Sequence, residues 1–244
     1  MDASYPMSAA QQSAASALAA DLQRVFGQRL HALVAYGLAG PDQLLHTLAL
    51  VDEVRFADLS ACAPSVHRWR RAGLAVPLLL ARNEFERSLD VFPVEYGEIV
   101  ANHITIIGHD PFAGARIAEA DLRRSCELQA KSHLIHLREG FLEAGGDPNE
   151  TVYLIASSSH GFRALLGNIV RLDRGPVRPG APESGDRALA AFAEHTIGVP
   201  ESVVLEVLGF KPTAGTIADP SGLLSRYVAA TERIWEYVDG WNRR

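Results

Sequence analysis

Two apolar segments joined by a very short loop limit what this chain can fold into. Residues 30–36 and 45–51 have the composition of buried strands, with a Gly-Pro-Asp sequence at 40–42 between them. That connection is too short for a helical crossover, so the two strands are expected to be antiparallel neighbours in one sheet. Gly37 and Leu38 follow the first strand and bring no polar side chain to this turn.

Helical and strand patterns continue on both sides of this pair. Over residues 8–26, the spacing of Leu18, Leu22 and Phe26 predicts an amphipathic helix that docks on the sheet. The elements expected next are a helix over 56–72, a strand over 76–81, a short helix or turn over 83–88 and a strand over 89–96. Pro93 removes one ladder donor, so this last strand is expected at an edge or a bulge.

Long helical patterns begin at residue 116. Five helices are expected, over 116–144, 150–172, 187–196, 201–208 and 222–238. Apolar side chains repeat every seven residues in the first of them, which contains Leu128, Ile135 and Leu142 with Leu134 and Phe141 beside them. We expect this set to form the apolar seam that packs the first helix on the others.

The boundary between the two halves is expected near residues 110–114. The proline-rich segment 175–185 is interpreted as a loop rather than a domain linker, because helical patterns resume directly beyond it. The sequence therefore predicts an α+β fold, with a mixed sheet and its helices over residues 1–112 and a helical bundle over residues 113–244.

Composition narrows the class of protein. Hydrophobic residues make up 48% of the chain, which is ample for a buried core, and the formal charge of -6 argues against nucleic acid as a partner. Cys62 and Cys126 lack the spacing of a metal site, so both are expected to be buried thiols in a reducing cytoplasm. No Lys or Arg precedes Arg24, unlike in a signal peptide, and no apolar run is long enough to predict a membrane span.

Several short segments share a recognisable pattern, namely Trp-Arg-Arg-Ala-Gly at 69–73, Pro-Leu-Leu-Leu at 77–80, Ser-Leu-Asp-Val-Phe-Pro-Val-Glu-Tyr at 88–96 and the helical stretch 126–140. With the glycine turn, they resemble bacterial nucleotidyltransferase-domain proteins of the aminoglycoside nucleotidyltransferase-like superfamily. The resemblance implies a small mixed sheet that carries a metal site and a helical bundle that completes the substrate cleft. Active members hold two divalent ions, usually magnesium, with three carboxylates.

The residues at the expected metal and triphosphate positions depart from that family pattern. Gly37 matches the glycine of its Gly-Ser turn, but Leu38 cannot supply the hydroxyl. Leu44 and His46 stand where paired metal ligands should project; leucine cannot bind magnesium, and imidazole suits transition metals better. Glu95 matches the third acidic position. The resemblance therefore implies Glu95 as the candidate catalytic residue, Gly37, Leu38 and His46 as candidate nucleotide-binding positions, and no metal ligand.

A basic stripe in the helical half has two interpretations. Arg124, Lys131 and Arg138 recur every seven residues, and the resemblance implies that a lysine of this half, here Lys131, reaches the triphosphate. Glu127 lies three residues after Arg124 and four before Lys131, so ordinary surface ion pairs explain the same pattern.

Three other clusters have structural explanations. Residues 67–71 combine cations with Trp69. Arginines at a helix C-terminus interact favourably with the helix dipole, so nucleic acid binding is not expected. Residues 157–161 contain three serines and a histidine without a Gly-x-Ser-x-Gly motif, and helix packing is expected there. His133 and His136 lack the glutamate of a metalloprotease motif and are expected on a polar face.

Three functional hypotheses follow. The first is a nucleotidyltransferase-fold protein that is catalytically inactive and binds a nucleoside triphosphate, a protein partner or a second copy of itself. The second is an active metal-dependent nucleotidyltransferase that moves a nucleoside monophosphate to an acceptor, with Asp42, Asp52 and Glu95 as magnesium ligands; Asp52 and Glu53 can equally mark the turn that ends a strand. The third places the function in the helical half, by similarity to the helical nucleases or antitoxin partners that accompany minimal nucleotidyltransferases, although this half lacks the Arg-x4-6-His signature of such a nuclease.

Overall fold

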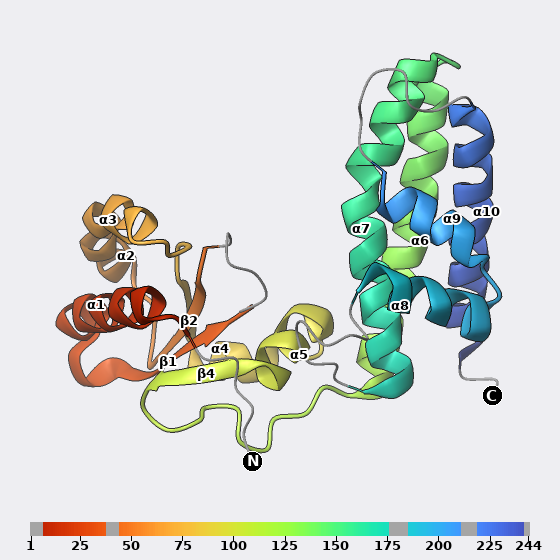
Figure 1. Cartoon of the computed structure of the whole chain (residues 1–244). Coiled ribbons are helices and arrows are strands. Elements are labelled where there is room, and N and C mark those ends of the chain that lie inside the picture. Colours follow the sequence, from red (N-terminus) through yellow and green to blue (C-terminus); the bar gives the residue numbers. More distant parts are fainter. Residues whose placement is uncertain (1–6, 38–43, 176–184, 211–218, 242–244) are drawn as a thin grey trace. The chain divides into compact units, whose positions relative to one another are not determined.

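The computed structural model describes residues 7–37, 44–175, 185–210 and 219–241 (Figure 1). The chain forms two compact units, residues 1–118 and 119–244. The first unit contains a mixed four-stranded sheet with helices, and the second is helical throughout its described residues. This is the α+β architecture that the sequence predicts, although the sequence placed the division at residue 112.

The sheet is built from β1 (Leu30–Tyr36), β2 (His46–Val51), β3 (Leu78–Ala81) and β4 (His103–Ile107), in the order β3-β2-β1-β4. β1 and β2 are antiparallel, with Leu33 opposite Ala49 and Tyr36 opposite His46, so the predicted strand pair is confirmed. β3 runs parallel to β2, and β4 is antiparallel to β1 on its other side. The sequence interpretation missed β4.

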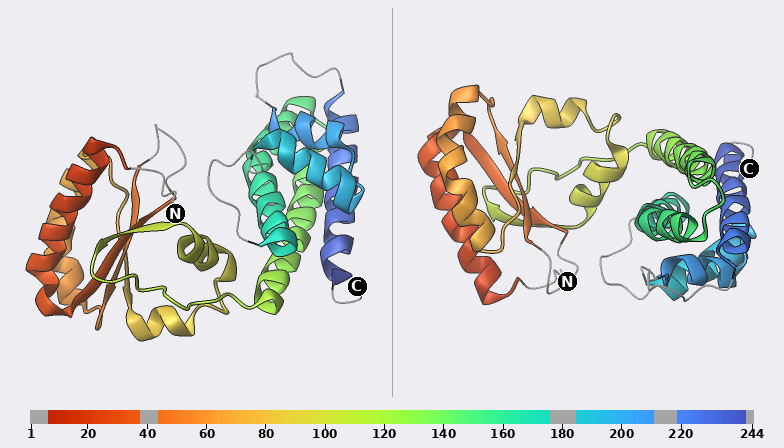
Figure 2. Two further views of the ribbon diagram at one scale, coloured as in Figure 1. Left: turned by 60° about the horizontal axis from the view of Figure 1, so that its bottom comes forward. Right: turned by 90° about the horizontal axis from the view of Figure 1, so that it is seen from above.

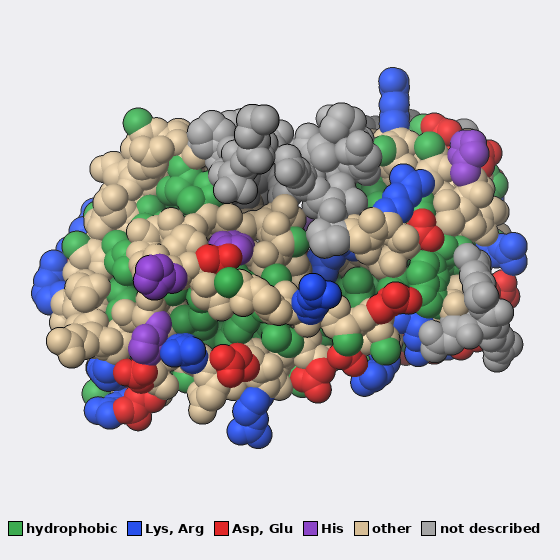
Figure 3. Space-filling view, turned by 90° about the horizontal axis from the view of Figure 1, so that it is seen from below, with side chains coloured by type: hydrophobic (Ala, Val, Ile, Leu, Met, Phe, Trp, Pro, Cys, Tyr) green, Lys and Arg blue, Asp and Glu red, His purple; other side chains and the backbone are tan. Residues whose placement is uncertain are grey.

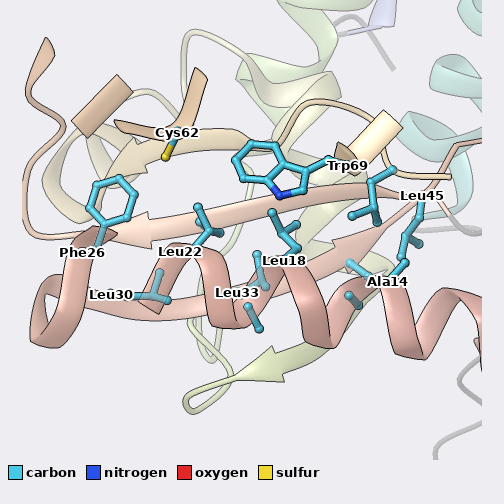
Figure 4. Close-up of a cluster of buried hydrophobic side chains, with 14 of the residues drawn as sticks. Ala14, Leu18, Leu22, Phe26, Leu30, Leu33, Leu45, Cys62 and Trp69 are labelled. Atoms are coloured by element: carbon cyan, nitrogen blue, oxygen red, sulfur yellow. The ribbon is translucent and has the colours of Figure 1, made fainter. Parts of the chain in front are cut away.

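One face of the sheet is covered by α1 (Ala9–Phe26), with α2 (Phe56–Cys62) and α3 (Val66–Arg71) beside it (Figures 1 and 2). Ser8 caps α1, because its hydroxyl accepts a hydrogen bond from the Gln11 backbone N–H. Leu18, Leu22 and Phe26 of α1 pack in one buried cluster with Leu33, Cys62 and Trp69 (Figure 4). The single helix expected over 56–72 is interrupted by a 3-10 turn at Ala63–Ser65.

The other face of the sheet packs against α4 (Arg82–Arg87) and α5 (Pro93–Ala101). Phe85, Tyr96 and Phe112 meet there. The centroid of the Phe85 ring lies 5.0 Å from that of Tyr96 and 4.9 Å from that of Phe112. The strand expected over 89–96 is wrong, because Pro93 begins a helix. Proline suits that position, since the first N–H of a helix has no partner to lose.

The second unit consists of α6 (Glu119–Glu143), α7 (Pro148–Arg174), α8 (Asp186–Phe192), a π-helical turn (Ala193–Ile197), α9 (Glu201–Leu208) and α10 (Pro220–Asp239). These correspond to the five expected helices. Asp147 and Asp219 cap α7 and α10 by accepting hydrogen bonds from backbone N–H groups of the first turn. No helix in the described ranges is both long and apolar enough to cross a membrane.

The predicted seam of α6 is wrong. Leu128 and Leu142 are 71% and 79% exposed, and Ile135 and Phe141 are exposed as well. Of that set only Leu134 is buried. The buried face of α6 contains Leu122, Cys126, Ala130, Leu134 and Leu137. α6 packs against both α7 and α10, and the small Cys126 and Ala130 side chains permit this close approach.

Candidate functional site

A pocket of about 670 Å³ opens where β1 ends and β2 begins. The strands contribute Tyr36, Gly37, His46 and Leu78 to it, and the segment that contains α5 contributes Phe92, Glu95, Tyr96, Glu98 and Ile99. We call it the Tyr36 pocket. It contains three of the residues that the sequence singled out, namely Gly37, His46 and Glu95. Leu38 lies outside the described residues.

The strand side of the Tyr36 pocket is aromatic. Tyr36 and His46 are cross-strand partners, and their ring centroids lie 5.6 Å apart. Gly37 has a φ of +65°, a left-handed conformation that favours glycine. A Cβ built there would lie 3.9 Å from His46 Cδ2, which is ordinary contact. Glycine is therefore favoured here by the backbone conformation and not by crowding.

The helical side of the pocket is acidic. Glu95 lies in the first turn of α5, not on a strand as expected, and Glu98 follows three residues later on the same face. Both carboxylates are exposed to solvent. Burial, together with the negative charge of Glu98, raises the pKa of Tyr36. The Tyr36 phenol therefore stays protonated at neutral pH and can donate a hydrogen bond.

This donor set does not fit a two-magnesium centre. Among the described residues, the ionisable lining consists of Glu95, Glu98, His46 and the two tyrosines, and no three His, Cys, Asp or Glu side chains of that part of the chain are grouped to hold a metal ion. Leu44 is exposed and offers no ligand.

The two described members of the alternative carboxylate set, Asp52 and Glu95, are not brought together either. Asp52 follows β2 at the end away from His46, about 20 Å along the strand. There it pairs with His31, and it does not line the Tyr36 pocket. Glu53 forms an ion pair with Arg55. Asp42 lies outside the described residues, so Glu95 is the one member of the set that is described in the pocket.

The basic stripe of α6 has partners within the second unit. Lys131 Nζ lies 3.5 Å from the centroid of the Trp235 ring, which is a cation–π contact. Arg124 pairs with Asp121 and Arg138 with Glu232, each at 3.0 Å. Glu127 pairs with Arg123 at 2.7 Å rather than with the stripe. A nucleotide contact by Lys131 remains a prediction from sequence.

Two of the other clusters are structural, as the sequence suggests. Trp69 is buried and its indole Nε1 donates to Asp21 at 2.8 Å, while Arg68 donates to the same carboxylate oxygen at 2.5 Å. The hydroxyls of Ser157, Ser158 and Ser159 donate to backbone carbonyls three residues earlier in α7. Neither cluster contributes to the Tyr36 pocket.

His133 does not lie on a polar face, and this expectation is wrong. Its Nε2 lies 2.6 Å from Tyr227 Oη, and its ring stacks on Phe162. Burial lowers the pKa of His133 to about 4, with a smaller contribution from His136. His136 is exposed and lies 3.3 Å from Glu139. α6 has apolar residues on its exposed face as well as on its buried face. Its sequence therefore does not show which face packs against other helices, or that His133 lies toward such a contact.

No protein-family model matches the chain, and a comparison with curated proteins gives no match. The nucleotidyltransferase resemblance therefore rests on the segments that carry it in the sequence. Fold and site together define an α+β protein of two compact units, whose first unit has an aromatic and acidic pocket at one end of its sheet.

Proposed function

We propose that this chain is a binding protein of nucleotidyltransferase-like architecture, that it takes a small organic cation in the Tyr36 pocket, and that it does not transfer nucleotides. The observation that carries the proposal is the lining of the pocket. Glu95 and Glu98 line it together with the rings of Tyr36 and His46, and the described lining includes no Lys or Arg.

The chemistry of these groups suits an ammonium or amidinium ion. Carboxylates accept charge-assisted hydrogen bonds from such a cation, and aromatic faces attract it through their quadrupole. Phe92 and Tyr96 add further rings, with centroids 5.6 Å apart. A cation attached to an apolar body would therefore meet complementary groups on both sides of the pocket.

A nucleoside triphosphate is the second candidate, because the sequence resemblance implies it. Its phosphates need cations or backbone donors around them, and the carboxylates of Glu95 and Glu98 repel them. Magnesium would normally offset this repulsion. The described donors of the Tyr36 pocket do not fit a magnesium pair, so the triphosphate is the weaker candidate.

The binding test adds benzylamine to the full chain and measures binding through the amide resonances of residues 93–101. We expect saturable shifts with benzylamine and none with benzyl alcohol, which has the same ring without the charge. Glu95→Gln and Glu98→Gln should each weaken binding roughly two- to fivefold. Asp90→Asn is the matched control, since Asp90 is exposed and does not line the pocket. Equal binding of the alcohol would contradict the proposal.

A nucleotide test distinguishes the two candidates. ATP with magnesium should neither compete with benzylamine nor release pyrophosphate in the presence of hydroxyl and amino acceptors. Competition by ATP would favour the triphosphate as ligand. Pyrophosphate release that requires magnesium and disappears in Glu95→Gln would show an active transferase and overturn the non-catalytic part of the proposal.

A further inference from the structure

A second pocket lies at the opposite end of β1 and β2. It has a volume of about 500 Å³, within the range of small-molecule sites. β1 contributes His31, β2 contributes Leu50, and α4 contributes Arg82 and Glu86; His109 comes from the loop after β4. We call it the Arg82 pocket. Figure 3 shows histidine, basic and acidic side chains gathered around apolar surface on one face of this unit.

The ionisable groups of this pocket divide into two kinds. Two of them have protein partners: His31 pairs with Asp52, and Asp110 Oδ1 lies 3.1 Å from His103 Nε2 and accepts a hydrogen bond from the Phe112 backbone N–H at 2.8 Å. The side chains of Arg82, Glu86 and His109 have no hydrogen bond or ion pair to any residue that the structure describes. These three groups are therefore available to a ligand.

Arg82 and Glu86 present opposite charges from one helix face. They lie four residues apart on α4, a spacing at which such side chains often pair. Arginine before glutamate is the weaker order for this pairing, and within the described part of the chain no ion pair joins them. Both heads therefore remain exposed at the rim of the same pocket.

The floor of the Arg82 pocket is apolar. Phe85 and Leu50 are each 3% exposed, and Leu89 and Pro111 also line the pocket. A purely anionic ligand would meet Glu86, and a purely cationic one would meet Arg82. A ligand that satisfies Arg82, Glu86 and the apolar floor has a carboxylate, an ammonium and an apolar body.

We propose that the Arg82 pocket binds a free α-amino acid with an apolar side chain. The planar Arg82 guanidinium donates two parallel hydrogen bonds to its carboxylate. Glu86 accepts hydrogen bonds from its ammonium, and its side chain lies on the Phe85 floor. This site is separate from the Tyr36 pocket and does not depend on the function proposed for that pocket.

The test compares L-phenylalanine with two analogues that each lack one of its charged groups. L-phenylalanine has both charges, 3-phenylpropionate lacks the ammonium, and 2-phenylethylamine lacks the carboxylate. Binding to the full chain is followed by amide resonances of residues 82–87, which separate this pocket from the Tyr36 pocket. We expect phenylalanine to bind about tenfold more tightly here than either analogue.

Variants then assign each charge to its residue. Arg82→Gln should weaken phenylalanine binding about tenfold, so that phenylalanine binds no tighter than 2-phenylethylamine. Glu86→Gln should leave phenylalanine binding no tighter than 3-phenylpropionate. Arg87→Gln is the matched control, because Arg87 is exposed on the same helix and does not line the pocket. Phenylalanine that binds no tighter than both analogues, or that responds equally to Arg87→Gln, would overturn the proposal. Circular dichroism of each variant shows whether the fold is retained.

Discussion

Asp21 is a buried carboxylate that joins α1 to α3. It is 8% exposed and accepts hydrogen bonds from the Trp69 indole, from Arg68 and from Arg24. Burial alone would raise the pKa of Asp21, but the hydrogen bonds from Trp69 and Arg68 outweigh it, and the pKa is lowered. Asp21 is therefore ionised at neutral pH and satisfies an indole N–H that has no access to water.

Removal of this carboxylate should destabilise the first unit. We expect Asp21→Ala to lower the free energy of unfolding by about 2–3 kcal/mol, because it leaves the buried Trp69 N–H without an acceptor. Asp21→Asn should cost less, since its amide oxygen can still accept from Trp69 Nε1. Urea titration followed by tryptophan fluorescence measures both. Asp90→Asn is the exposed control, with an expected change within about 0.5 kcal/mol. Equal losses in the Ala and Asn variants would contradict the role of the acceptor.

At the candidate site, the sequence singled out three residues that line one pocket and missed most of the others. Gly37 and His46 follow from the strand pair, because antiparallel register places the end of one strand beside the start of the next. Glu95 was expected from a strand and lies on a helix. Glu98 was missed for the same reason, since a spacing of three residues shares a face only in a helix.

Two elements show why local patterns were insufficient. The segment 89–101 has a proline and a run of apolar residues, which fit an edge strand or a helix that begins at proline. β4 is only five residues long, and its β-branched run 104–107 was the available signal. Its pairing with β1 is a long-range contact that no local pattern specifies.

The two apolar faces of α6 allow a prediction at the scale of the element. Ala130 is fully buried between helices, whereas Leu128 is mostly exposed. Ala130→Leu should lower the free energy of unfolding by about 1–3 kcal/mol, because the interior has no room for the added atoms. Leu128→Ser should change it by less than about 0.5 kcal/mol. Chemical denaturation compares the two variants. A larger loss of unfolding free energy for Leu128→Ser than for Ala130→Leu would support the predicted seven-residue seam and contradict the buried face of the structure.

At the scale of the whole molecule, the α+β architecture was predictable because it depends on the succession of elements and not on their exact contacts. What the sequence does not specify is which polar groups become buried. In the first unit, Asp58 accepts two hydrogen bonds from Arg29, at 2.9 and 2.6 Å, and these bonds lower the pKa of Asp58 to about 2. In the second unit, burial lowers the pKa of His133 to about 4.

These two residues predict that acid destabilises the chain in two stages. Between pH 6.5 and pH 4 the unfolded chain binds a proton at His133 and the folded chain does not, so stability is complete above pH 6.5 and falls as the pH decreases through this window. The loss should reach up to about 3 kcal/mol. Below pH 4 Asp58 becomes protonated in the unfolded chain, whereas in the folded chain it stays ionised down to about pH 2. This difference adds a second loss of stability.

Urea titrations at pH 7, 5 and 3 measure the two stages, and one variant separates them. His133→Gln keeps a polar partner for Tyr227 Oη but does not titrate, so it should remove the loss between pH 7 and pH 5 and leave the loss below pH 4. His136→Gln is the control, because His136 is exposed on the same helix and its removal should leave both stages in place. An unchanged slope between pH 7 and pH 5 in His133→Gln would mean that His133 is not the group whose protonation opposes folding.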